Sequence, residues 1–226
     1  MRGDSHSPRE IEAIIYSLIG LDPEPLILPP LIYFHSYRKV SEGGVELRSM
    51  VEGRNYPRGY RNVPRNLSIS TFKLSVIRAM MSRGGLFERF EDAKAGEVLS
   101  TLNKLMERYV GGYIEKLRPS PDNTLEFRVT PTNGGPSFNF DGLSSGQKEI
   151  ISTLFLIWEH TRKHPGIVLI DEPELHLNPE WHRAFIRSLH EIAPRNQYII
   201  ATHSEDIFAS VAPERRILLE VQSEGP

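Results

Sequence analysis

The stretch Gly166-Ile167-Val168-Leu169-Ile170-Asp171-Glu172-Pro173 decides the fold of this 226-residue chain. Its four consecutive apolar residues end in two carboxylates, a pattern typical of a strand that is buried on both faces of a sheet. Tyr198-Ile199-Ile200-Ala201 is a second such run, and Ile217-Leu218-Leu219 is expected to be the last strand. Helical spacing in residues 145–160, and in the segment that Pro179 opens, separates the runs. This alternation predicts an α/β fold with a mostly parallel sheet, flanked by helices on both faces.

The upstream part of the chain is predicted to add both strands and helices. A polar loop rich in Arg, Gly, Pro and Asn is expected over residues 53–66. The expected helices are 8–19, 70–83 and 91–110, and the expected strands are 31–34, 45–51, 113–117 and 125–129.

Composition excludes several classes of protein. The chain has no cysteine, which rules out disulfides and thiolate metal sites, and its net charge is −2. No apolar run approaches the length of a membrane span, so we expect a cytoplasmic protein with no membrane partner. Five arginines between Arg48 and Arg65 face only Glu52 there, and two tyrosines lie among them. Arg54, Arg58 and Arg61 are therefore candidates for nucleic-acid contact, and a solvated loop that pairs with the acidic half is the alternative.

Polar residues follow two of the predicted strands where each one ends. Asp171 and Glu172 come after the first, and Thr202 and His203 come after the second. Functional groups gather at the carboxyl ends of strands in an open parallel sheet, so these side chains share one crevice if the strands are neighbours. Asp171 suits Mg²⁺ that keeps most of its waters, Glu172 suits a general base, and His203 suits contact with a phosphate or an attacking water. A simple turn and a helix cap are the alternative interpretations of these two segments.

Leu143-Ser144-Ser145-Gly146-Gln147 opens the predicted helix 145–160. Free N–H groups and the positive end of the helix dipole can bind an anion there, and Gly146 lets a phosphate approach the backbone. Taken alone, the segment is more typical of an ordinary N-cap. No G-x-x-x-x-G-K-[ST] phosphate loop occurs in the 226 residues.

These motifs resemble the ATPase heads of the ABC class, in the branch of the SMC, Rad50, RecF and OLD-like AAA ATPases. Residues 143–147 look like the ABC signature, residues 167–172 look like the Walker B strand, and His203 matches the switch histidine. Glu174-Leu175-His176-Leu177-Asn178-Pro179 is similar to the D-loop region, which adds Asn178 to the candidate nucleotide-binding residues.

The resemblance implies a P-loop NTPase core that uses ATP and Mg²⁺ in a head-to-head dimer. Asp171, Glu172 and His203 would act in their own head, whereas Ser144, Ser145, Gly146 and Gln147 would contact the nucleotide of the other head. Residues 1–39 would be a partial N-terminal part of the core, residues 40–120 a helical lid, and residues 121–226 the C-terminal core. The missing Walker A loop favours an incomplete chain.

Two functions therefore stay open. The first is an ATPase head in DNA repair or phage defence, whose partners are a second or homologous head, DNA, and a nuclease or effector subunit. The second is a non-catalytic interaction module, with nucleic-acid binding as an addition to either.

Overall fold

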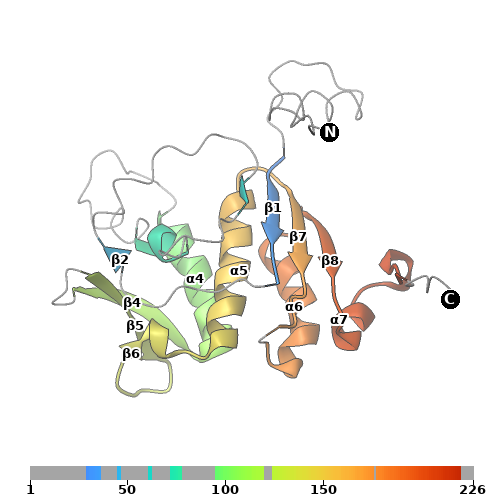
Figure 1. Ribbon diagram of the computed structural model, residues 1–226. Helices are drawn as coiled ribbons and strands as arrows, with labels where there is room; N and C mark the ends of the chain where they lie inside the picture. Colours follow the sequence, from blue (N-terminus) through green and yellow to red (C-terminus); the bar gives the residue numbers. More distant parts are fainter. Residues whose placement is uncertain are drawn as a thin grey trace, which may run out of the picture.

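Two β-sheets with helices between and behind them organise the chain (Figure 1). This computed structural model describes residues 29–36, 45–46, 61–62, 72–77, 95–119, 124–175 and 177–219. The described residues form one hydrophobic cluster to which both sheets contribute, so the two sheets share a core.

The first sheet is parallel, as the apolar runs predict. Its strand order is β3-β1-β7-β8, and every neighbouring pair runs in the same direction. Its strands are β1 (Leu31–Phe34), β3 (Arg61–Asn62), β7 (Ile167–Asp171) and β8 (Gln197–Ala201). Helix α6 (Pro179–Ile192) connects β7 to β8, which makes a parallel crossover unit. The predicted α/β fold with a parallel sheet flanked by helices is confirmed.

The second sheet is antiparallel. Strands β4 (Gly112–Pro119) and β5 (Thr124–Pro131) form a hairpin, which confirms the two strands predicted for residues 113–117 and 125–129. The short strands β2 (Val45–Glu46) and β6 (Phe138–Asn139) also pair with β5.

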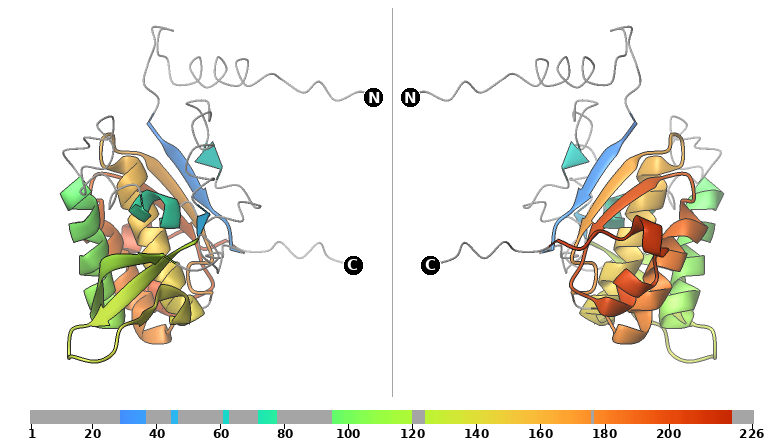
Figure 2. Two further views of the ribbon diagram at one scale, coloured as in Figure 1. Left: turned by 90° about the vertical axis from the view of Figure 1, so that its left-hand side faces the viewer. Right: turned by 90° about the vertical axis from the view of Figure 1, so that its right-hand side faces the viewer.

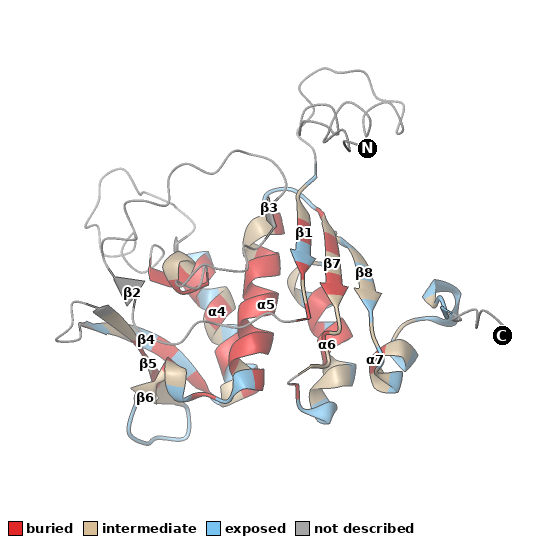
Figure 3. Cartoon of the chain, in the orientation of Figure 1, coloured by how far each residue is buried: buried red, intermediate tan, exposed pale blue. Residues whose placement is uncertain are grey.

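Helix α5 (Ser145–Thr161) is the central element of the fold. Most of its residues are buried, and Figure 3 shows burial along nearly its whole length. Helix α4 (Ala95–Val110) packs against α5 and β4, and residues 72–77 are also helical and add Phe72 to the core. Phe72 contacts Phe155 of α5 edge to face, with ring centroids 5.4 Å apart. Burial on several sides explains why α5 is apolar around most of its circumference.

The predicted last strand is wrong. Residues 217–219 form no strand, and Ile217, Leu218 and Leu219 are 81%, 77% and 86% exposed. The chain turns back before them, because Arg216 donates hydrogen bonds to the carbonyls of Val211 and Ala209 and stacks over Phe208. These contacts hold Arg216 beside helix α7 (Glu205–Ala209), and residues 217–219 make no strand pairing with β8. A run of three apolar residues does not by itself reveal this.

Among the described residues, helices cover one face of the parallel sheet, and the predicted helix 8–19 lies outside them. Figure 2 shows the helices on one side of this sheet. Ile32, Phe34, Val168 and Ile170 are buried and belong to the core cluster. On the opposite face Tyr33 is 37% exposed and Ile199 is 54% exposed. Within the described ranges, this second face therefore has no covering layer, although the strands are apolar enough to accept one.

Several predictions lie outside the described residues. They are the helix 8–19, most of the loop 53–66 with Arg54 and Arg58, and the parts of helices 70–83 and 91–110 beyond those given above. Arg61 lies in β3, but its side chain is not described. The division at residues 39 and 120 stays a prediction. No helix in the described ranges is long and apolar enough to cross a membrane.

Candidate functional site

The carboxyl ends of β7 and β8 lie side by side. The two strands are parallel neighbours, and Asp171 is in register with Ala201, the last residue of β8. Asp171 and Glu172 therefore leave the sheet at the same edge as Thr202 and His203. The neighbour relation on which the sequence argument depends is present in the structure.

Glu172 has an unusual backbone conformation. Its φ angle is 45°, and it is the one non-glycine residue with positive φ in the part of the chain that the structure describes. Its N–H still donates to the carbonyl of Ala201 at 2.8 Å, so the ladder between the two strands extends to this residue. A non-glycine residue in this region costs on the order of 1 kcal/mol, and such strain is found most often at functional sites.

The side chain of Glu172 lies close to the imidazole of His203. Glu172 Oε1 is 3.5 Å from His203 Nε2. The glutamate side chain is 32% exposed and the histidine side chain is 89% exposed. A ligand in solvent can therefore reach both side chains. At 3.5 Å, the two side chains can still move closer to each other.

Glu174 connects the two strand ends. Its Oε2 accepts a hydrogen bond from the Thr202 hydroxyl at 2.7 Å, and its Oε1 accepts one from the His203 N–H at 2.6 Å. Thr202 Oγ1 in turn accepts the N–H of Ser204 at 3.0 Å. One carboxylate thus fixes the chain where β8 has ended.

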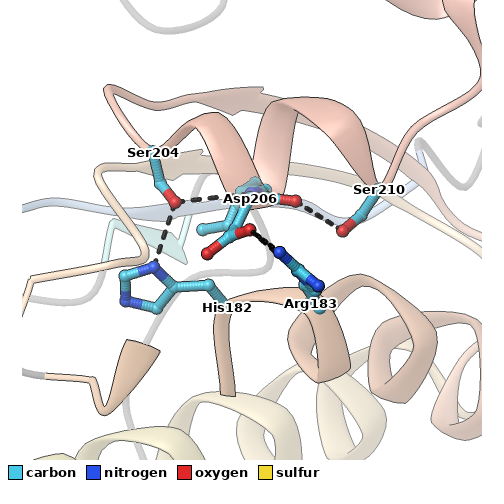
Figure 4. A network of polar contacts seen from close by, with 6 residues as sticks. His182, Arg183, Ser204, Asp206 and Ser210 are labelled. Carbon is cyan, nitrogen blue, oxygen red and sulfur yellow. Dashed lines mark hydrogen bonds and ion pairs between the residues drawn. The ribbon is translucent and has the colours of Figure 1, made fainter. Parts of the chain in front are cut away.

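Two further contacts join α6 to the residues after His203, and Figure 4 shows them from close by. His182 Nδ1 lies 3.0 Å from Ser204 Oγ, and Arg183 Nε donates to Asp206 Oδ1 at 2.7 Å. The Ser204 side chain also accepts from the N–H of Ile207 and so caps α7. The cap interpretation of this segment is therefore correct for Ser204.

The helix start at residues 144–147 is closed by its own hydrogen bonds. Ser144 is the N-cap of α5, and its hydroxyl accepts the Gln147 N–H, while the Gln147 side chain accepts the Ser144 N–H. Gln147 Nε2 also donates to the carbonyl of Tyr109 at the end of α4. This is a complete capping box, so the N-cap interpretation of the segment is confirmed.

The remaining residues of this helix start differ in exposure. Ser145 is exposed, whereas Gly146 is buried against the fold. Just upstream, the carboxylate of Asp141 pairs with the buried Lys73 at 2.7 Å, and its carbonyl accepts from Lys148. These contacts fix where α5 begins.

Asn178 serves as the N-cap of α6. Its side-chain oxygen accepts the N–H of Glu180 at 3.1 Å, and Pro179 occupies the first turn. A role of Asn178 toward a nucleotide stays a prediction, as do the roles of the other predicted site residues.

Oxygen donors at the strand ends suit a hard cation that keeps most of its waters, with Asp171 as the residue nearest the sheet. Within the described ranges, no group of three or more His, Cys, Asp and Glu side chains could by itself hold a metal ion. A cation here would therefore need oxygen ligands from water and from a phosphate.

Sequence reasoning overlooked two residues of this region. Glu174 belongs to the quoted D-loop stretch, yet it was not among the candidate site residues. His182, which belongs to no predicted motif, contacts the cap of α7. A signal for Glu174 was present, because it lies two residues after Glu172 and so stays near the end of the same strand.

Comparisons with known proteins find similar ATPases. The retron Vc95 probable ATPase of Vibrio cholerae serotype O1 biovar El Tor is 25% identical over 152 residues, which cover 62% of this chain and 29% of that protein. The Septu protein PtuA of Bacillus thuringiensis is 30% identical over 115 residues, which cover 46% and 28%. The chain therefore spans less than a third of the length of either relative.

Similar solved structures include the SMC head domain from Thermotoga maritima. It is 19% identical with a TM-score of 0.37, and the match covers 59% of this chain and 44% of that one. A structure of an SMC ATPase is 17% identical with a TM-score of 0.42, and the match covers 59% and 78%.

The family comparison confirms the resemblance to ABC-class ATPase heads that the motifs indicate. The family model described as "AAA domain, putative AbiEii toxin, Type IV TA system" matches residues 52–209. Because this match includes more than half of the chain, the protein belongs to this family of AAA domains.

Proposed function

We propose that this chain is an ATPase head that binds and hydrolyses ATP where two heads meet. The observation that carries the proposal is the strained Glu172 beside the exposed His203, at the ends of two neighbouring parallel strands. Glycine adopts a φ angle of 45° without strain, so the glutamate at this position carries a backbone cost. A catalytic use of the carboxylate would account for that cost.

Three residues act in the head that holds the nucleotide. Asp171, at the end of β7, would hold a Mg²⁺ ion through the waters of that ion. Glu172 takes a proton from the attacking water as general base, and its position near solvent at the strand end suits this task. His203 donates a hydrogen bond to the terminal phosphate or to that water. Mg²⁺ and ATP, when bound, supply the charge neutralisation and the transferable phosphoryl group.

A second set of residues acts on the nucleotide of the facing head. Ser144, Ser145, Gly146 and Gln147 present the positive end of α5, a long and deeply buried helix. Ser145 is the exposed hydroxyl of this set and is the residue we assign to direct phosphate contact. Asn178, at the start of α6, is assigned to the same interface.

The test is phosphate release from ATP by the protein, with any in-frame sequence upstream of Met1 included. We expect Mg²⁺-dependent turnover that falls by about 10²- to 10⁴-fold in Glu172→Gln, since that change removes the base and keeps the shape. Glu214→Gln is the matched control, because Glu214 lies in an exposed 3₁₀ turn away from the strand ends. Turnover that is equal in wild type and Glu172→Gln would disprove the proposal.

A non-catalytic interaction module is the second candidate function. Two observations favour it: the sequence has no G-x-x-x-x-G-K-[ST] motif, and the side chains of Ser144 and Gln147 already hydrogen bond within their own helix start. Isothermal titration of ATP into the 226-residue chain separates the two candidates. Micromolar binding favours the ATPase head and counts against the module, whereas no binding at millimolar ATP by the chain and by the protein with its upstream sequence favours the module.

The proposed setting is DNA repair or phage defence, in the cytoplasm. A second copy or a homologous head is the proposed partner, and DNA and a nuclease or effector subunit are further candidates. Contact of Arg54, Arg58 and Arg61 with nucleic acid stays a proposal. It predicts DNA binding that weakens with salt and is lost when the three charges are reversed.

A further inference from the structure

We infer that Glu174 is a positioning residue that fixes the backbone of His203 and thereby sets the separation between its imidazole and the Glu172 carboxylate. This inference rests on the proposed function of the Glu172–His203 pair. It identifies Glu174 as the residue that controls the geometry of that pair. Three features of the structure support the inference: the bonds of Glu174, the exposure of His203, and the attachment of the residues that follow.

The bonds of Glu174 replace the sheet ladder at the point where it ends. Strand β8 stops at Ala201, so Thr202 and His203 have left the regular pairing with β7. The carboxylate of Glu174 accepts from both of them, at 2.7 and 2.6 Å. Hydrogen bonds of this length to an ionised carboxylate are among the stronger ones in proteins.

Because the side chain of His203 is exposed, the position of its imidazole depends mainly on its backbone. Its side chain is 89% exposed, and its contact with Glu172 is 3.5 Å long. An imidazole with so little packing takes its position from its main chain. Glu174 holds that main chain through the His203 N–H, and it follows Glu172 by two residues. Both members of the pair are thus anchored to the same short segment after β7.

The residues that follow His203 are bonded to the start of helix α6, which follows β7 in the chain. Ser204 contacts His182, and Asp206 pairs with Arg183, both on the first turns of α6 (Figure 4). The Arg183–Asp206 pair is solvent-exposed and contributes little stability by itself. The packing of the buried Ile207 holds α7 in the core, and the Glu174 carboxylate is the group that holds the main chain at Thr202 and His203 before it.

A purely structural glutamate and a positioning glutamate give different kinetics. The first lowers stability and changes every activity of the protein alike. The second lowers kcat and leaves KM for ATP nearly unchanged, because only the Glu172–His203 geometry is disturbed. Glu174→Gln tests this difference. The amide oxygen of glutamine can accept one of the two hydrogen bonds, whereas its NH₂ group cannot accept the other.

The experiment compares wild type, Glu174→Gln, Glu174→Ala and the control Glu214→Gln in the full chain. Amide hydrogen exchange at His203 is measured by NMR, and kcat and KM are measured for ATP. We expect exchange at His203 to accelerate about tenfold to a hundredfold in Glu174→Ala, since a bond to a charged acceptor is lost. We expect kcat to fall by at least about tenfold, with Glu174→Gln intermediate and KM within about twofold.

A second measurement does not depend on ATP turnover. Glu172→Gln should shift the ring resonances of His203, because the two side chains are 3.5 Å apart. In a Glu174→Ala background that response should be lost, because the acceptor of the His203 N–H is gone. Glu174→Leu, which also removes that acceptor and keeps more of the side-chain volume, serves in its place if Glu174→Ala does not fold. A response to Glu172→Gln that survives in these backgrounds overturns the inference, as does unchanged exchange at His203, or faster exchange with unchanged kcat. A protein without Glu172-dependent turnover would contradict the proposed function, while the resonance measurement still decides the role of Glu174.

Discussion

The two candidate half-sites of this protein are built in opposite ways. At the start of α5, the side chains of Ser144 and Gln147 bond to each other's backbone, so the bonds there are local in sequence. At the ends of β7 and β8, Glu174 reaches Thr202 and His203, 28 and 29 residues away. The helix start contains no strained residue, whereas the strand ends contain Glu172 at a φ angle of 45°.

This difference shows that the strand ends, unlike the helix start, are not explained by folding alone. A capping box stabilises a helix whether or not a ligand binds, so the residues at the start of α5 are accounted for by folding. A left-handed glutamate carries backbone strain that glycine would not have at the same position. The strand ends are therefore the stronger evidence for catalysis, and the role of the helix start depends on a facing partner.

The largest expected effect is at Glu172, where one substitution should change turnover and stability in opposite directions. Glu172→Gly should abolish turnover, with a loss of about 10²- to 10⁴-fold, because the base is gone. It should also raise the free energy of unfolding by about 1 kcal/mol, because glycine adopts positive φ without strain. Urea unfolding and phosphate release measure the two effects. A glycine variant less stable than wild type would mean that the Glu172 side chain supports the fold, and the contrast between the half-sites would weaken.

The second prediction tests whether the helix start acts across a dimer. Ser145→Arg should be inactive alone, because a bulky charge would occupy the facing phosphate site, and Glu172→Gln should be inactive alone. An equal mixture should recover about a quarter of wild-type turnover, since half of the two-fold dimers would be mixed and each would keep one intact site. Turnover is measured against total protein. If the mixture stays as inactive as its components, both half-sites belong to one head or no dimer forms.

The same contrast explains how much the sequence reveals. Periodicity located α5, α6, β1 and the β4–β5 hairpin, because burial imposes a regular spacing on long elements. The order of residues after β7 and β8 also placed Glu172 and His203 together. The left-handed backbone of Glu172 and the bonds of Glu174 depend on the packing of two distant segments, so no local pattern encodes them.

The failed strand at residues 217–219 has a similar cause. An apolar run indicates a strand only when an edge is available to pair with it. Arg216 bonds to the carbonyls of Val211 and Ala209 and thereby directs the chain away from β8. Tertiary contacts of one arginine override the β propensity of the three residues that follow.

The third prediction concerns stability at the helix start. Ser144→Ala should lower the free energy of unfolding by about 1 kcal/mol, because the N-cap oxygen that accepts the Gln147 N–H is removed. The matched variant Ser145→Ala should change stability by less than about 0.5 kcal/mol, because Ser145 is exposed. Urea denaturation of both variants measures this difference. A larger loss for Ser145→Ala would show that its hydroxyl has a structural role and is not kept for a partner.

The smallest expected effect is a loss of stability at alkaline pH, and it concerns Tyr109 at the end of α4. The carbonyl of Tyr109 accepts a hydrogen bond from Gln147 at the helix start, and its buried hydroxyl lies 2.6 Å from Ser188 Oγ of α6. Burial raises the pKa of Tyr109, so the folded state retains a proton that the unfolded state releases first. This stabilisation is complete below the ordinary tyrosine pKa of about 10 and is lost as the pH rises toward the higher folded value.

Tyr109→Phe should therefore flatten the fall in the free energy of unfolding between about pH 9 and pH 11. The variant also loses the bond to Ser188, so the slope against pH is the quantity to compare, not the absolute stability. Tyr113→Phe is the matched control, because Tyr113 lies on β4 and is 37% exposed. An unchanged slope in Tyr109→Phe would place the alkaline transition elsewhere, with Tyr198, whose pKa burial also raises, as the next residue to substitute. A flattened slope would show that the contact of α4 with α6 at Ser188 responds to pH, a sensitivity that belongs to the fold and not to the Glu172–His203 pair.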